Sequence, residues 1–173
     1  RNTGDGRFAD VTDEAGLGDG RFSQGAAVGD LDNDGFLDIY LGTGEPELTS
    51  IIPNRVFKNV AGTGFSDVTT VGGFGHLQKG HAVAFGDIDN DGDQDVYVVN
   101  GGAYQGDTFR NSLFENPGAE SVFLTLELEG RKSNRYGVDS RIRVDVTSPA
   151  GPRSFFRTVG SGGSFGGSTL RLE

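Results

Sequence analysis

The sequence has no cysteine and no methionine. Without cysteine a disulfide framework is excluded, and cysteine usage gives no information about the redox compartment. Asn-x-Ser/Thr sequons are absent as well. Because the chain starts at Arg1 with neither an initiator methionine nor a signal peptide, we expect it to be a processed or truncated piece of a longer chain.

Long apolar runs and long helical patterns are also missing. No run approaches the roughly 20 apolar residues that a membrane span needs, and the best helix candidate is a single turn from Thr12 to Ala15. Positive charge is scarce, with 15 Lys and Arg against 25 Asp and Glu and a net charge of −10. Phosphate binding needs a basic patch, so we do not expect a nucleic-acid partner. The lack of long apolar runs likewise predicts no membrane span.

Glycine, in contrast, is abundant. The chain has 30 glycines among 173 residues, far above the usual share of about 7%. Many tight turns between short strands would use them. Together with the lack of helical patterns, this predicts an all-β protein.

Two acidic stretches of nine residues, Asp30–Asp38 and Asp87–Asp95, are almost identical. Each has aspartate at positions 1, 3, 5 and 9 and glycine at position 6. Carboxylates this close repel one another unless a cation lies between them, and Ca²⁺ takes six to eight oxygen ligands. Position 7 would offer its backbone carbonyl. The predicted ligands of two Ca²⁺ ions are Asp30, Asp32, Asp34, Phe36 and Asp38, and Asp87, Asp89, Asp91, Asp93 and Asp95.

These stretches differ from an EF-hand loop. An EF-hand needs glutamate at position 12 and a helix on each side, but position 12 is Leu41 in one loop and Val98 in the other. The residues that follow each loop are β-branched and aromatic, which indicates strand. We therefore expect each ion in a loop that joins two strands, with Asp38 or Asp95 at the start of the second strand. The alternative is an acidic turn that binds nothing.

The loops belong to an internal repeat with a period of 57 residues. Asn2 aligns with Asn59, and Asp10-Val11-Thr12 aligns with Asp67-Val68-Thr69. Residues 1–118 thus hold two full repeats and a fragment of a third. Each repeat predicts about four short strands, which is the content of a propeller blade. The connections 42–54 and 101–111 are expected to be exposed.

From about residue 119 to residue 173 the pattern changes. Residues 123–128 largely alternate apolar and polar side chains, residues 141–146 alternate strictly, and residues 155–159 read as a returning strand. Residues 149–152 form the predicted hairpin turn. Residues 168–172 begin a further strand after the glycine-rich stretch 160–167. A small antiparallel β-sheet domain is expected here.

At this point the residues resemble known families. The repeats look like the FG-GAP/VCBS repeats of integrin-α-type β-propellers, through the Asp-x-Asp-x-Asp-Gly-x-x-Asp loops. The tail resembles the ASPIC/UnbV domain, and the combination is similar to cartilage acidic protein-like secreted proteins. The stretches that carry the tail resemblance are 124–126, 133–135, 141–144 and 159–165.

The resemblance implies Ca²⁺ at both loops, held by the same ten residues, and an extracellular location. It also implies a propeller of about seven blades, of which this chain holds about two. The tail departs from the pattern at Asp139-Ser140, where Gly-Ala is expected, and it ends before the closing strand.

Other candidate sites have a simpler interpretation beside the functional one. His76 and His81 are five residues apart among glycines, a spacing more typical of structural histidines than of a zinc or catalytic pair. The glycine-rich stretch 161–168 lacks the Lys-Ser/Thr ending of a phosphate loop. The basic residues of the tail could bind a carboxylate or an acidic glycan, or form a solvated strand face. They are Arg131, Lys132, Arg135, Arg141 and Arg143. The recurring phenylalanines, Phe8 with Phe65 and Phe57 with Phe114, indicate core packing.

The sequence therefore favours a non-enzymatic, extracellular, calcium-stabilised β module for adhesion, matrix scaffolding or fibre assembly. Two blades cannot close a ring, so we expect other copies, or the rest of a longer chain, to cover the open edges. A carbohydrate- or protein-binding module that uses the loops or the basic tail is the alternative. A hydrolase is a third hypothesis, supported only by His76 and His81.

Overall fold

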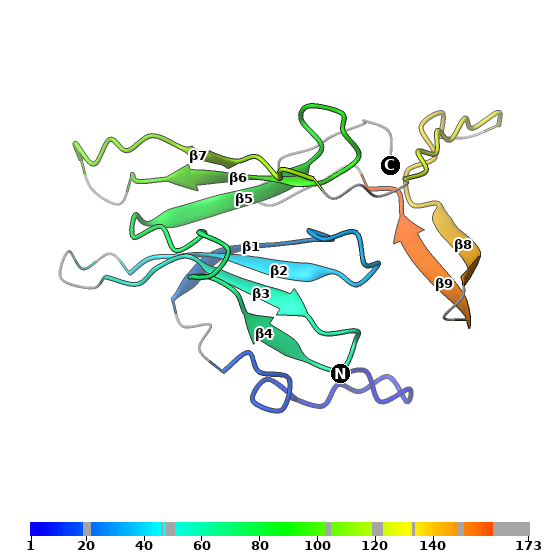
Figure 1. The fold of residues 1–173 in the computed structure, drawn as a ribbon, viewed down its shortest axis with the longest axis horizontal. Coiled ribbons are helices and arrows are strands. Elements are labelled where there is room, and N and C mark those ends of the chain that lie inside the picture. Colours follow the sequence, from blue (N-terminus) through cyan, green and yellow to red (C-terminus); the bar gives the residue numbers. More distant parts are fainter. Residues whose placement is uncertain are drawn as a thin grey trace. The chain divides into compact units, whose positions relative to one another are not determined.

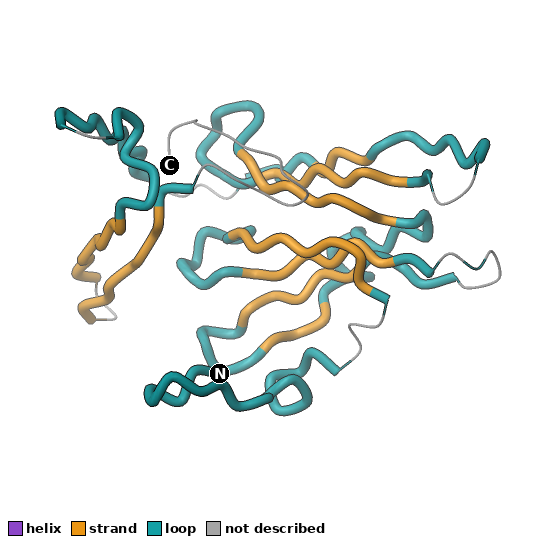
Figure 2. The backbone as a smooth tube through the Cα atoms, turned by 180° about the vertical axis from the view of Figure 1, so that it is seen from behind, coloured by secondary structure: helices purple, strands orange, loops and turns teal. Residues whose placement is uncertain are grey.

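The computed structural model describes residues 1–18, 22–45, 47, 51–102, 105–118, 123–132, 134–148 and 151–160. The chain divides into two compact units, Arg1–Ala119 and Glu120–Glu173. Every regular element in the described residues is a β-strand, and no helix occurs among them (Figures 1 and 2). The prediction of an all-β protein is confirmed. No helix in this part of the chain is long and apolar enough to cross a membrane.

The first unit contains two antiparallel sheets that repeat one another. The first sheet has the order β1-β2-β3-β4 and the second the order β5-β6-β7 (Figure 1). The strands of the first sheet are β1 (Ser23–Gly29), β2 (Asp38–Thr43), β3 (Arg55–Asn59) and β4 (Phe65–Asp67). Those of the second are β5 (Gly80–Gly86), β6 (Asp95–Asn100) and β7 (Ser112–Phe114).

The strand register follows the sequence repeat. Ile39 pairs with Phe57 across β2 and β3, and one period later Val96 pairs with Phe114 across β6 and β7. The two sheets are therefore successive blades of a partial propeller, as the repeat predicted. The fourth strand of the second blade would fall at residues 122–124. Residue 122 lies outside the described residues, and residues 123 and 124 belong to no strand.

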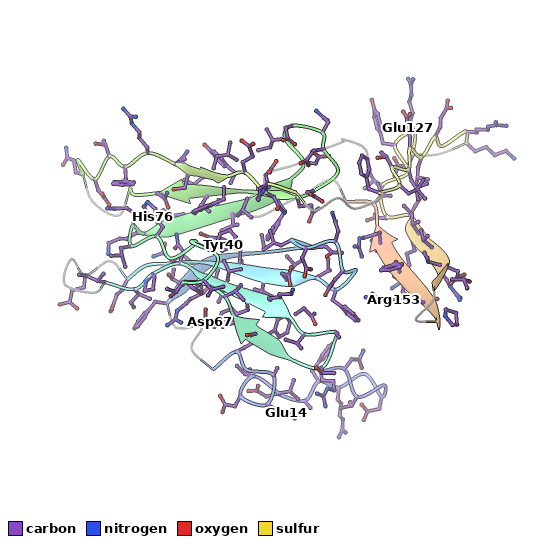
Figure 3. The ribbon with its side chains drawn as sticks, in the orientation of Figure 1. Glu14, Tyr40, Asp67, His76, Glu127 and Arg153 are labelled. Atoms are coloured by element: carbon purple, nitrogen blue, oxygen red, sulfur yellow. The ribbon has the colours of Figure 1, made fainter. Side chains whose placement is uncertain are left out.

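The core of this unit lies between the two blades, where β1 and β5 run side by side (Figure 1). Tyr40, Val56, Val83, Val96 and Val98 form one buried cluster. A Cβ atom on Gly25 would lie 1.8 Å from the carbonyl oxygen of His81, so glycine at this position allows the backbones to approach. Burial raises the pKa of Tyr40, labelled in Figure 3, to about 12.

A single helical turn recurs in both repeats. The amides of Ala15 and Gly72 donate to the carbonyls of Val11 and Val68, at 2.7 and 2.8 Å. In front of each turn the Asp-Val-Thr motif makes the same local bond: the amide of Thr12 donates to Asp10, and that of Thr69 to Asp67. The predicted turn at Thr12–Ala15 is confirmed and has a counterpart one period later.

The N-terminal residues differ from the expectation of a packed repeat. The isolated pairing of Asn2 with Phe8 is the counterpart of Asn59 with Phe65 at the β3–β4 turn. Phe57 is 1% exposed, but Phe8 is 78% exposed. The prediction that Phe8 packs in a core was wrong, because no sheet among the described residues covers this hairpin.

The expected exposure of the connections was wrong at both ends of 42–54 and at Gly101, whereas Asn111 at the end of 101–111 is exposed as expected. Thr43 and Asn54 are fully buried, because the amide of Thr43 donates to Oδ1 of Asn54 at 2.9 Å and its hydroxyl donates to the carbonyl of Pro53 at 2.6 Å. The amide of Asn100 donates to Asn111 in the same way, at 3.2 Å. Hydrogen bonds thus join the two ends of each connection.

In the second unit the described strands form one hairpin, β8 (Arg141–Ser148) with β9 (Gly151–Thr158). Both strands were predicted and are confirmed, but β9 begins earlier than expected, because Gly151 and Pro152 of the predicted turn 149–152 pair with β8. The strand predicted at residues 123–128 was wrong: this stretch is irregular, and no described strand pairs with it to satisfy its backbone. The predicted strand 168–172 and the glycine-rich stretch 161–167 lie outside the described residues.

Thr69 allows a direct test of the Asp-Val-Thr motif. Its hydroxyl oxygen accepts the amide of buried Val56 at 3.0 Å, and Thr69 itself is 4% exposed. We expect Thr69→Val to lower the free energy of unfolding by about 1–3 kcal/mol, because a buried amide loses its acceptor. Urea unfolding measures this. Thr12→Val is the matched control, since Thr12 is exposed, and an equal loss in both variants would contradict this role of the motif.

Candidate functional site

The two acidic stretches form equivalent loops, one between β1 and β2 and the other between β5 and β6. Asp38 and Asp95 are the first residues of β2 and β6, so the predicted strand–loop–strand arrangement is confirmed. Position 4 of each loop, Asn33 and Asn90, has a positive φ of 53° and 65°. Asparagine tolerates this left-handed conformation better than most residues, and the glycine at position 6 adopts it freely.

Within each loop, carboxylates accept hydrogen bonds from backbone amides. The amide of Gly35 donates to Asp30 at 2.8 Å, and that of Gly92 to Asp87 at 3.1 Å. The carboxylates at position 5 accept the amide two residues later, at 2.8 Å in the first loop and 3.0 Å in the second. These bonds hold the loop curled.

The aspartate at position 9 ties its loop to two strands. Asp38 and Asp95 are 1% and 2% exposed. One oxygen of Asp38 accepts the amide of Leu31 at 2.9 Å, and the other accepts the amide of Asn59 at 2.8 Å. Asp95 makes the same two bonds one period later, both at 2.8 Å. Burial raises the pKa of Asp38, although both backbone hydrogen bonds oppose this effect.

The structure brings three carboxylates together in each loop, but not the same three. Oxygens of Asp30, Asp32 and Asp38 lie within 4.8 Å of one another, and so do oxygens of Asp87, Asp89 and Asp91. Asp34 is outside the first group and Asp95 outside the second. Partial desolvation, together with the neighbouring negative charges, raises the pKa of Asp89. A donor set made only of carboxylate oxygens suits a hard divalent cation.

Of the remaining predicted ligands, Phe36 and Asp93 occupy position 7 of their loops. The ring of Phe36 packs against Gly62, where an added Cβ atom would lie 3.1 Å from the ring. Asp93 is 5% exposed, and its carboxylate accepts a hydrogen bond from the side-chain amide of Asn33 in the other loop. The residues at position 7 thus differ in chemistry as well as in surroundings.

Lys58, on β3, is a residue of the site that sequence reasoning missed. Its ammonium pairs with the carboxylate of Asp32, which raises the pKa of Lys58. One period later Glu115 takes the place of Lys58. Lys58 and Glu115 line one cavity of about 510 Å³ in this unit, together with Asp32 and Asp38. The reversal of charge between aligned repeats was the signal in the sequence that could have identified this pair.

The two loops lie side by side, an arrangement that was also not predicted. The amide of Asp30 donates to Oε1 of Gln94 at 2.9 Å. The side-chain amide of Asn116, just after β7, donates to the carbonyl of Leu31 at 2.7 Å. Residues of the second repeat therefore hold the first loop, and the two loops form one acidic pair.

The histidines of the first unit do not belong to this pair of loops. His76 accepts the amide of Gln78 at its Nδ1, 3.1 Å away, and its ring packs on Phe109 at 5.3 Å (Figure 3). Among the described residues neither His76 nor His81 joins a group of potential metal ligands. The five basic residues singled out in the second unit, Arg131, Lys132, Arg135, Arg141 and Arg143, are exposed, and Arg143 pairs with Asp145 at 2.9 Å.

A family model described as FG-GAP-like repeat matches residues 1–41 and 44–98 of the chain. The match covers more than half of the sequence and includes both acidic loops. A search of the curated proteins finds no match.

The position-9 aspartates are expected to matter for stability even without a cation. We expect Asp38→Ala, measured in excess chelator, to lower the free energy of unfolding by about 1–3 kcal/mol, because two partly buried amides lose their acceptor. Asp34→Ala is the control: the hydrogen bond that Asp34 accepts in the described part of the chain comes from the nearby amide of Phe36, so we expect a loss of about 0.5 kcal/mol or less. Equal losses would show that Asp38 has no clamping role.

Proposed function

Because the chain belongs to the FG-GAP-like repeat family, we propose that its first unit is an extracellular, calcium-stabilised β module used in adhesion or scaffolding. FG-GAP repeats are propeller blades and are typical of extracellular and cell-surface proteins. Both acidic loops fall within the matched repeats. The second unit, with its resemblance to ASPIC/UnbV domains, would be an accessory domain of the same module.

The observation that carries the calcium proposal is the pair of three-carboxylate groups. Three carboxylates within 4.8 Å of one another repel strongly where solvent screening is incomplete. A divalent cation would remove this repulsion, and the donors available in each loop are the hard oxygen ligands that Ca²⁺ prefers.

The proposed role of the ion is structural. Each loop joins the two inner strands of its blade, β1 to β2 or β5 to β6. An ion that binds the folded loop and not the unfolded chain adds its binding free energy to the stability of the fold. The loops are also hydrogen-bonded to each other, so the ions would strengthen the contact between the blades.

We expect calcium to raise the melting temperature and a chelator to lower it. At a free concentration of 100 times Kd, one site contributes about 2.7 kcal/mol to the free energy of unfolding. Asp89→Ala should remove a large part of this effect, whereas Asp5→Ala, an exposed aspartate outside the loops, should not. Calorimetry with calcium and with EDTA measures both. A melting temperature that is the same with calcium and with EDTA would refute the proposal.

Self-association is the second part of the proposal. The outer strands β4 and β7 are edge strands in the described residues, and open edges pair with other chains unless they are blocked. Further repeats, or other copies of this chain, would cover them.

We therefore expect this chain, by itself, to form assemblies in calcium that dissociate or unfold in chelator. Multi-angle light scattering over a range of protein concentrations, with and without EDTA, measures their mass. A monodisperse monomer at high concentration in calcium would contradict self-association. It would not contradict the proposed calcium sites.

A further inference from the structure

The two acidic loops have the same backbone conformation but different charges around them. Phe57 and Phe114 occupy equivalent positions in the blade register, so the residues that follow them, Lys58 and Glu115, begin from equivalent backbone positions. One is a cation and the other an anion. Position 7 also makes the second loop more negative, because it is Phe36 in the first loop and Asp93 in the second.

In the first loop a protein cation already contacts the carboxylate group. The ammonium of Lys58 pairs with Asp32, and Asp32 is one of the three carboxylates that lie within 4.8 Å of one another. A divalent ion that uses Asp32 must either displace this ammonium or bind beside it. Both arrangements weaken binding, because like charges repel at short range.

In the second loop the local charge favours a cation. A Cβ atom added to Gly118 would lie 2.8 Å from Oδ2 of Asp93 and 3.3 Å from Oδ2 of Asp91. The carboxylates of Asp91 and Asp93 therefore both lie next to the backbone of Gly118. Asp93 thus adds a fifth carboxylate to this loop, where the first loop has the apolar ring of Phe36. Glu115, one period after Lys58, is an anion and lines the cavity that also contains Lys58 and Asp32, so the second repeat does not repeat the Lys58 cation.

We propose that the two loops bind Ca²⁺ with unequal affinity, and that Lys58 sets the difference. This inference rests on the calcium proposal above. The second loop, Asp87–Asp95, binds Ca²⁺ first and more tightly. The first loop, Asp30–Asp38, fills at higher calcium concentration, as the ion competes with Lys58 for Asp32. The module therefore has one calcium site for basal folding and a second that responds to changes in calcium.

Isothermal titration with CaCl₂ tests this on single-loop variants of the full chain. Asp89→Asn with Asp91→Asn leaves only the first loop, and Asp30→Asn with Asp32→Asn leaves only the second. We expect the second loop to bind at least about tenfold more tightly, since one unit charge beside a divalent ion has an effect of this order. In the first-loop background, Lys58→Gln should raise the affinity by about tenfold.

Two controls separate charge from structure. Lys58→Arg keeps the positive charge and should keep the low affinity. Lys79→Gln removes the charge of another lysine, whose side chain packs on Gly44 at the far end of β2 from the loop, and should leave both affinities unchanged. If a single-loop variant does not fold, the unmodified chain is titrated instead, and Lys58→Gln should merge its two binding steps into one.

The possible results are distinct. No calcium binding in the unmodified chain overturns the proposed function, and this inference with it. Binding to both loops with equal affinity, or no effect of Lys58→Gln, overturns only the inference. Tighter binding by the first loop would also overturn it. Tighter binding by the second loop, with a gain from Lys58→Gln that Lys58→Arg does not reproduce, supports it.

Discussion

The arrangement of both blades depends on two buried carboxylates, those of Asp38 and Asp95. Each closes its loop by accepting an amide at position 2 and fixes the next strand by accepting an amide at its end. Buried carboxylates of this kind are stable only where hydrogen bonds replace water. The bonds also set the position of the other aspartates in the loop. Closing the loop brings negative charges together, and the proposed calcium ion would offset their repulsion.

The same constraint joins the two repeats. Glycines at the β1–β5 contact let the backbones approach. The loops at the ends of these strands are hydrogen-bonded to each other, from Asp30 to Gln94 and from Asn33 to Asp93. The buried apolar cluster is small, with Tyr40 and four valines. Polar contacts at the strand ends therefore carry a larger part of the order in this unit than they would in a domain with a large core.

The repeats keep their backbone and vary their charge. Equivalent hydrogen bonds recur with nearly equal lengths 57 residues apart, while Lys58 is replaced by Glu115 and Phe36 by Asp93. A duplicated element can thus keep its fold, because the fold depends on backbone geometry and a few aspartates. The affinity of the loop for the proposed ion would diverge more easily, because it depends on the charges around the loop.

The sequence by itself determined what depends on local patterns. The period of 57 residues, the β-branched runs and the loop spacing predicted the blade strands, the position of both loops between strands and the helical turn at Thr12. Alternation of side chains predicted β8 and β9, but it was misleading at residues 123–128, since a strand also needs a partner. The tertiary structure alone decided which carboxylates meet, that Lys58 reaches Asp32, that the loops lie side by side and that Phe8 stays exposed. These features depend on groups far apart in the chain, and no local pattern encodes their distance.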